Sequence, residues 1–457
     1  MNSILQTLKE LPKKLYEIQL TDKNIGEFLE ECQAVYNETI LLYARQRIEE
    51  LDQAILACRE ERGNFKVVKS GVSRGVETKA GFLEYERRYY RDTHTKEYAY
   101  LVDAALGLAP YQRIEDELQL SLVEAASQMS YRKASDVVCE GRVSASSVMN
   151  AIRKVEIPEE TPKEIRKRVE ELHVQADEDH VRLQQQGKKA GQIRFAALHE
   201  PKVRVGQGRY ELPQRHILSS VKENPEAFGE RLLDTLDARY DLDHVKRIYL
   251  HGDGASWIES LRRSLPRSIP ILDHFHLEKA LLGVCKGDRR LRNLLRSCLQ
   301  PWDDVALEKE LQMLVDSDVC TEDKARKLWV YLQNNREGIV NHFTLDHGGS
   351  CAEGLVSHVF SKRFSRDPLA WSIKSLRKLS EIRVHLENGE KLSRSMLRKE
   401  ETQVEKRVPL LSAAKTRVAK KDKKEFGDWN VSIPGSELSS GAIGAIIKRI
   451  NRGGFIC

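Results

Sequence analysis

Hydrophobic positions follow several spacings along the chain, and each spacing predicts a different kind of structure. Over residues 1–60 apolar side chains recur at helical spacing, as in FLEECQAVYNETILLYARQRIEELDQAIL, which predicts packed helices. The β-prone segments GFLEYERRYY and EYAYLVDAALGL, separated by polar RDTHTK, predict a β-hairpin. Helical spacing returns over 117–154, where a turn at Gly141 and a helix capped by Ser144 predict a helix-turn-helix.

After a charged, proline-containing linker at 157–168, the pattern becomes that of an α/β domain. Its predicted elements, in order, are the strands LHVQAD, QIRFAAL and either RYELP or HILSS, a helix over 225–240, the strand RIYLHGD, a helix over 254–263 and the strand SIPILD. Three antiparallel strands followed by helix, strand, helix and strand is the order of an RNase H-like core. Residues 277–345 show only helical, highly charged sequence and interrupt this core, which resumes with a helix from Ala352 to about Phe364.

The expected fold is therefore an RNase H-like α/β core with a mixed five-stranded sheet. An all-α insertion interrupts it, and helical and small α+β DNA-binding regions precede it. The predicted regions are 1–63 (N-terminal helices), 64–156 (β-hairpin and helix-turn-helix), 170–276 (first part of the core), 277–348 (helical insertion), 349–380 (last core helices) and 381–457 (basic C-terminal region).

Three acidic residues lie at the ends of predicted strands or at the start of a predicted helix of this core. Asp177 ends the first strand, Asp253 ends the fourth, and Glu353 begins the later helix. Because strand ends point side chains toward one edge of a sheet, we expect these carboxylates to converge. Oxygen ligands suit Mg²⁺, and a pair of such ions about 3.5–4 Å apart supports phosphoryl transfer. The sequence thus predicts a site for two Mg²⁺ or Mn²⁺ ions, with Asp179 as an alternative first ligand. A purely structural reading is also open, since Asp253 suits a cap of the next helix.

Asp273 and His276 form a D-x-x-H motif after the fifth strand, in ILDHFHLEKAL. A structural zinc site is not predicted, because only His274 and His251 lie near them and no cysteine pair has ligand spacing. We expect a hydrogen-bonded Asp/His pair that supports the catalytic edge. A packed strand terminus is the alternative.

Composition narrows the protein class. The chain has 457 residues, 40% of them hydrophobic, and no apolar run long enough to span a membrane, so we expect a cytoplasmic protein. Its eight cysteines include no CxxC pair, which favours reduced thiols. The net charge is only +6, but residues 361–430 hold 19 Lys/Arg against 10 Asp/Glu. A local excess of this kind suits nucleic acid, although a solvated tail has the same composition.

Five stretches are similar to bacterial insertion-sequence transposases of the ISLre family: ETKAGFLEYERRYY…EYAYLVDAALGL, ADEDHV, YLHGDGASWI, ILDHFHLEKAL and SCAEGLVSHVFSKRFSRDPLAWS. The resemblance covers nearly the whole chain and extends to the Mutator-like group of DDE transposases, which are RNase H-like. It implies that Asp177, Asp253 and Glu353 are the catalytic metal ligands. It also places the family's Cys/Asp-x-x-His motif on Asp273 and His276.

What the resemblance implies is a nucleoid-associated transposase of the bacterial cytoplasm that binds the terminal inverted repeats of its element. Cleavage and strand transfer into target double-stranded DNA would follow, carried out by a homodimer or a larger assembly. A stand-alone RNase H-like nuclease and a non-catalytic helix-turn-helix regulator remain alternatives. The residues expected to contact DNA are Arg87, Arg88, Tyr131, Arg132, Lys133, Ser144, Ser146, Ser147, Asn150, Lys362 and Arg363.

Overall fold

The computed structural model describes residues 3–20, 23–158, 165–184, 190–366, 369–398 and 414–420. The chain divides into two compact units. Unit 1 consists of residues 1–76, 80–113 and 400–457, and unit 2 of residues 77–79 and 114–399. Among the described residues, no helix combines the length and the apolar character needed to cross a membrane.

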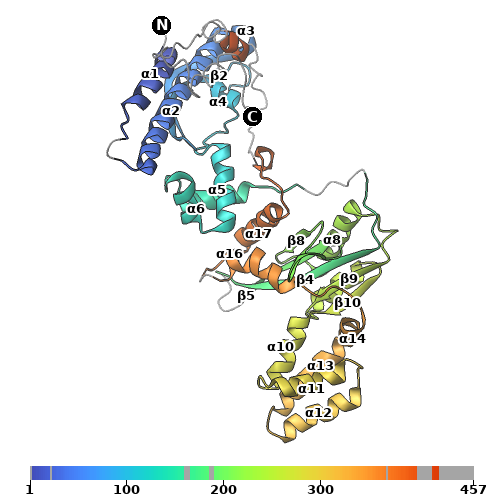
Figure 1. Cartoon of the computed structure of the whole chain (residues 1–457). Coiled ribbons are helices and arrows are strands. Elements are labelled where there is room, and N and C mark those ends of the chain that lie inside the picture. Colours follow the sequence, from blue (N-terminus) through green and yellow to red (C-terminus); the bar gives the residue numbers. More distant parts are fainter. Residues whose placement is uncertain are drawn as a thin grey trace, which may run out of the picture. The chain divides into compact units, whose positions relative to one another are not determined.

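Unit 1 combines long helices with a small sheet (Figure 1). Helix α2 begins at a capping box, in which Asn24 and Glu27 each accept a hydrogen bond from the other's backbone N–H. The predicted hairpin turn is present, but the strand after it is short, and LVDAAL forms a helix that ends at the left-handed Gly107. The elements are α1 (Ser3–Glu17), α2 (Ile25–Ala57), α3 (Arg59–Arg62), β1 (Phe65–Thr78, which reaches into unit 2), β2 (Gly81–Asp92), β3 (Tyr98–Ala99) and α4 (Leu101–Leu106).

Unit 2 is built on a mixed five-stranded sheet with the strand order β10-β9-β4-β5-β8. Strands β4, β5 and β8 are antiparallel, whereas β9 and β10 run parallel to β4. This arrangement is consistent with an RNase H-like core. HILSS supplies the third strand, while RYELP contributes to a separate hairpin of β6 (Val203–Gly206) and β7 (Arg209–Glu211). The sheet strands are β4 (Glu171–Arg182), β5 (Ala190–His199), β8 (His216–Ser220), β9 (Arg247–Gly252) and β10 (Ser268–Leu272).

The two faces of this sheet carry different layers of helices. Alternate residues of a strand point to opposite faces, so Val174 and Ala176 face α8 (Pro225–Arg239) and α9 (Ser256–Ser264). On the other face, Val181 and Phe195 pack against a continuous helical segment with a π-helical turn in its middle. The helices of that layer are α15 (Ala352–Leu355), η1 (Val356–Ser361), α16 (Lys362–Phe364) and α17 (Ile373–Glu387). A short 3₁₀ turn, η2 (Arg394–Met396), follows.

The predicted helix-turn-helix packs into the same core. Helix α6 ends where Glu140 and Gly141 both adopt left-handed conformations, and the Ser144 side chain then accepts a hydrogen bond from Ser147 N–H to begin α7. The predicted cap at Ser144 is therefore confirmed. The helices are α5 (Asp116–Gln128), α6 (Tyr131–Cys139) and α7 (Ala145–Lys154). Residues 159–164 of the predicted linker, and most of the predicted basic C-terminal region, lie outside the described residues.

Between β10 and α15, the chain forms a bundle of helices with its own apolar core (Figure 1). It also packs on the sheet, because Gly338 lies against the backbone of Leu272 at the end of β10. A Cβ at position 338 would lie 3.1 Å from the backbone nitrogen of Leu272, a tight contact, so the close approach favours glycine. The helices are α10 (His274–Val284), α11 (Arg289–Leu299), α12 (Asp304–Asp316), α13 (Glu322–Asn334) and α14 (Arg336–Thr344).

Candidate active site

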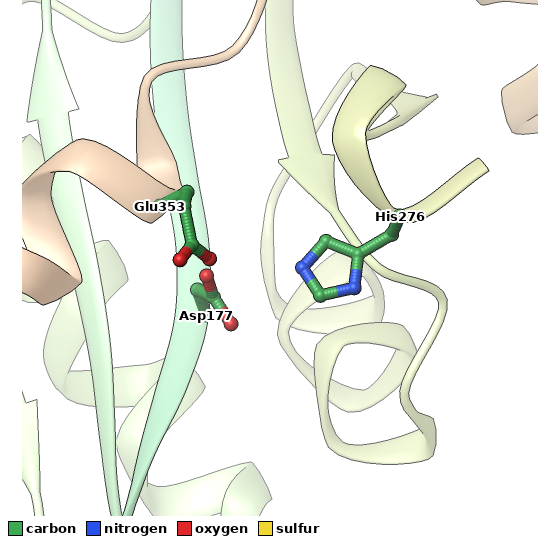
Figure 2. Close-up of side chains that lie close together, drawn as sticks. All are labelled: Asp177, His276 and Glu353. Atoms are coloured by element: carbon green, nitrogen blue, oxygen red, sulfur yellow. The ribbon is translucent and has the colours of Figure 1, made fainter. Parts of the chain in front are cut away.

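Three side chains from distant parts of the sequence meet beside β4, the central strand of the sheet in unit 2. One ligand atom each from Asp177, His276 and Glu353 lie within 4.8 Å of one another. Asp177 comes from β4, Glu353 from the first turn of α15, and His276 from the first turn of α10 (Figure 2). Within the described residues, this is the one group of three or more such side chains close enough to share a metal ion.

Asp253 lies beside this group rather than within it. It follows the end of β9, and its Oδ1 accepts a hydrogen bond from Ala255 N–H at 2.9 Å. The N-cap residue of α9 is Ala255, and the helix has no side-chain cap, so Asp253 is not the cap of that helix. Its charge nevertheless raises the pKa of Asp177, although less than burial does. The structure thus brings two of the three predicted acids into contact distance, places the third next to them and adds His276.

The electrostatic environment of Asp177 is unfavourable for a bare carboxylate. Its pKa is raised from 3.8 to about 6, mainly by burial and in smaller part by the charges of Asp253 and Glu353. A hydrogen bond from Glu178 N–H at 2.7 Å and the proximity of His276 act in the opposite direction. A cation at this position would relieve the repulsion among the carboxylates.

Asp179, the alternative first ligand, is held elsewhere on the same face of β4. Its Oδ1 accepts hydrogen bonds from Ser361 Oγ at 3.1 Å and from Ser365 Oγ at 2.9 Å. These serines lie at the end of the π-helical turn and just after α16. Asp177 is the acid of β4 that lies against Glu353, which favours it as the ligand.

The donor set fits a hard divalent cation. His276 Nε2 is buried and has no hydrogen-bond partner among the described residues. A metal ion or a substrate proton would satisfy such an atom, and the neighbouring carboxylates supply the oxygen ligands that Mg²⁺ and Mn²⁺ prefer.

Asp273 supports the turn that carries His276, but through the backbone. Its side chain caps α10 by accepting hydrogen bonds from Phe275 N–H at 2.7 Å and His276 N–H at 3.3 Å. The predicted hydrogen bond between the Asp and His side chains is absent from this described segment. Asp273 instead fixes where α10 begins, and so sets the direction of the imidazole.

Arg87 and Arg88, two predicted DNA contacts in unit 1, pair with buried acids of that unit, Arg87 from a buried position and Arg88 from a half-buried one. Arg87 is 7% exposed, forms an ion pair with Asp103 and lies 3.4 Å from the centre of the Tyr100 ring. Arg88 pairs with the buried carboxylate of Asp52. The burial of these carboxylates explains the arginines, since a buried acid requires a partner. The expectation that both guanidinium groups face DNA is corrected accordingly.

The predicted DNA contacts of unit 2 fall into buried or half-buried residues and exposed ones. Arg363 is 5% exposed, donates to the Ala126 carbonyl at 3.0 Å and stacks on Trp371, and the Tyr131 ring packs edge-on against the same tryptophan. These two are structural, contrary to expectation. Ser147 is half-buried. The remaining predicted contacts are exposed: Arg132, Lys133, Ser144, Ser146, Asn150 and Lys362.

A basic hollow beside α7 escapes prediction from the sequence. It has a volume of about 810 Å³, and its lining includes four cations and the single acid Glu381. The cations are Arg153 at the end of α7 and Lys374, Arg377 and Lys378 on α17. The sequence signal for this hollow is the spacing of Lys374, Arg377 and Lys378, which places them on one face of α17.

Related proteins cover three quarters of the chain. A UPF0236 protein of Caldanaerobacter subterraneus subsp. tengcongensis, whose name joins eleven locus designations, is 32% identical over 346 residues, which are 75% of this chain and 73% of that protein. A second UPF0236 protein of the same bacterium, named for four loci, is 32% identical over 352 residues, with the same two coverages.

Among solved structures, the cryo-EM structure of the simian T-cell lymphotropic virus intasome with the PP2A regulatory subunit B56 gamma is similar to 52% of this chain and 73% of the matched chain. The TM-score is 0.15 and the sequence identity 14%, a likeness too slight to support a statement about fold or function. The profile of the family described as "Uncharacterised protein family (UPF0236)" matches residues 21–401. The chain therefore belongs to the uncharacterised protein family UPF0236.

Proposed function

We propose that this protein is a DDE transposase, an enzyme that cleaves DNA at the terminal inverted repeats of its element and joins the freed ends to target DNA. The observation that carries the proposal is the meeting of Asp177, Glu353 and His276, with Asp253 beside them, at the central strand of a mixed five-stranded sheet. An ISLre-type transposase with an RNase H-like core would hold its catalytic acids in this arrangement.

Asp177, Asp253 and Glu353 are the residues that would hold two Mg²⁺ or Mn²⁺ ions, with the imidazole of His276 beside them. Bound there, such ions would stabilise the charge that develops on the phosphoryl oxygens during transfer. The protein's own contribution is orientation. Glu178 N–H fixes one oxygen of Asp177, and Ala255 N–H fixes one oxygen of Asp253.

The proposed reaction has two in-line displacements. In the first, a water oxygen bonds to the phosphorus at the element end while the bond from phosphorus to the 3′ oxygen breaks, which leaves a 3′-OH. In the second, that 3′ oxygen bonds to a phosphorus of target DNA and displaces the 3′ oxygen of the target strand. A protein that lacks the second step is a nuclease, so joining is the diagnostic activity.

DNA would follow the helix-turn-helix and the basic hollow. The exposed Ser146 and Asn150 lie on α7, the helix that would enter the major groove, and the exposed Ser144 is its N-cap. Arg153 continues this helix into the hollow, where the cations of α17 would bind phosphates and fix the register of the duplex. Reversing the charge of Lys374 and Arg377 should weaken binding and flatten its salt dependence.

The relatives add support of a different kind. One protein name that joins eleven loci of a single genome is expected of a gene present in many copies. Mobile elements multiply in this way, whereas a gene for a regulator or a repair nuclease has no such reason to do so.

The test is incubation of the protein with labelled element ends, a target plasmid and Mg²⁺. Joined products support transposition, nicks without joining favour a nuclease, and binding without either favours a regulator. The matched variants are Glu353→Gln and Glu230→Gln, the latter at an exposed glutamate of α8. If folded Glu353→Gln joins ends as efficiently as Glu230→Gln, the proposal is wrong.

A further inference from the structure

Gln175 is a fully buried polar residue on the face of β4 that carries Asp177. It is 0% exposed, and it lies two residues before Asp177, so both side chains point to the same side of the sheet. A buried amide is costly unless its donors and acceptors are paired. Its partners are therefore informative about what the position does.

The neighbouring strand fixes the orientation of this amide. His199 Nδ1 lies 2.6 Å from the carbonyl oxygen of Glu200, which only accepts, so Nδ1 carries the proton. Burial lowers the pKa of His199 to about 4, and the neutral ring therefore offers Nε2 as an acceptor. Gln175 Nε2, at 3.1 Å, donates to it. The amide oxygen is thereby turned toward the other side.

The amide oxygen of Gln175 accepts hydrogen bonds from the segment that leads into α15. Ser350 Oγ and Cys351 N–H each donate to Gln175 Oε1 at 3.1 Å. Cys351 is the N-cap residue of α15, and Glu353 follows two residues later in the first turn. Gln175 and Asp177 are thus two residues apart on β4, and they face two positions that are two residues apart on the returning chain.

A second contact secures the same loop a little earlier. Lys202 Nζ donates to the carbonyl oxygens of Gly348 at 3.1 Å and Gly349 at 2.6 Å. Both glycines have positive φ, so the loop turns here before it reaches Gln175. Every residue from 348 to 351 therefore has a polar contact to half-buried Lys202 or buried Gln175.

We propose that Gln175, oriented by His199, is a positioning residue that fixes Glu353 beside Asp177 and so sets the affinity of the site for a divalent cation. This inference rests on the proposed function, because it assigns Gln175 a role in the same site. A glutamine that served stability alone would lower the melting temperature when replaced, without a selective loss of metal affinity.

The experiment measures Mn²⁺ affinity from the electron paramagnetic resonance signal of the free ion, with circular dichroism as the check on folding. Gln175→Leu should raise the Kd for Mn²⁺ about 10–100-fold. Ser350→Ala removes one of the two donors and should raise it about fivefold. The control is Gln119→Leu, since Gln119 of α5 is also buried (6% exposed) but donates to the carbonyl oxygen of Ile114, just before that helix.

Two further readouts separate positioning from stability. The double variant of Gln175→Leu and Ser350→Ala should bind Mn²⁺ no more weakly than Gln175→Leu alone, because the serine acts through the glutamine. In the joining assay, Gln175→Leu should lower kcat about as much as it weakens Mn²⁺ binding and leave the KM for DNA unchanged.

The outcomes are distinct. Weakened Mn²⁺ binding by folded Gln175→Leu, with Gln119→Leu equal to the parent, supports the inference. Equal binding by Gln175→Leu and the parent overturns it and leaves the proposed function standing. If Gln175→Leu does not fold, Ser350→Ala decides by the same criterion. A parent protein that binds no Mn²⁺ overturns the metal site of the proposed function itself.

Discussion

Replacing Asp177 by asparagine should make the metal-free protein more stable at neutral pH. Burial is the main cause that raises the pKa of this carboxyl from 3.8 to about 6. At ~1.4 kcal/mol per pH unit, that difference corresponds to about 3 kcal/mol of unfolding free energy lost when the folded carboxyl ionises. Asparagine stays neutral and keeps an oxygen that can accept the hydrogen bond from Glu178 N–H.

The sign of the pH dependence makes this prediction specific. Because the pKa is higher in the folded state, the protonated carboxyl favours folding fully below about pH 4, and that contribution is lost as the pH rises through about 6. Asp177→Asn should therefore match the parent at pH 4 and gain its full advantage by pH 7. Urea unfolding in the presence of EDTA measures both, with Asp243→Asn at an exposed position as the control. A variant no more stable than the parent at pH 7, or equally favoured at every pH, would refute the reasoning.

Three further outcomes are expected. The apparent Kd of the parent for Mn²⁺ should rise by up to about tenfold per pH unit below pH 6, because protons compete with the ion for Asp177. Electron paramagnetic resonance measures this Kd, and a constant value between pH 7 and pH 5 would contradict the prediction. Gly254→Ala should lower the unfolding free energy by about 1 kcal/mol or more in thermal melts, since φ is +87° and the new methyl group would overlap Asn335; an unchanged melting temperature contradicts it. Arg87→Met should destabilise unit 1 by about 1–3 kcal/mol, because it removes the nearer of the two guanidinium groups paired with buried Asp103 and leaves Arg74 at 3.9 Å. The salt dependence of DNA binding should stay as in the parent, and a reduced salt slope would restore Arg87 as a DNA contact.

The central sheet is predictable because its strands are apolar runs bounded by polar residues, glycine or proline. Other segments are harder to predict. RYELP and HILSS have similar β propensity, and only burial distinguishes HILSS, which lies in the sheet, from the exposed RYELP. Strand β1 is not evident from its sequence, FKVVKSGVSRGVET, because it is largely exposed and carries charged and glycine positions. The segment LVDAAL looks β-prone but forms a helix that ends at Gly107.

The candidate site is predictable in its membership more than in its geometry. The order of strands and helices narrows the first ligand to Asp177 or Asp179 and the last to Glu353. The choice between Asp177 and Asp179 depends on the serines that engage Asp179, which the order of elements does not reveal. Local sequence also fails to show whether an arginine is exposed or buried. Arg87 lies in an aromatic, basic stretch, but it is buried against the carboxylate of Asp103 on α4.

The helical bundle between β10 and α15 has a consequence for how distant relatives are recognised. His276 stands just inside its first helix, and Glu353 stands just after its last. Relatives whose bundles gain or lose a helix would separate these two residues differently in sequence, yet keep them neighbours in space. Alignments that penalise long gaps would then split one family into several. Short blocks around each ligand, joined by unscored spacers, would keep it whole.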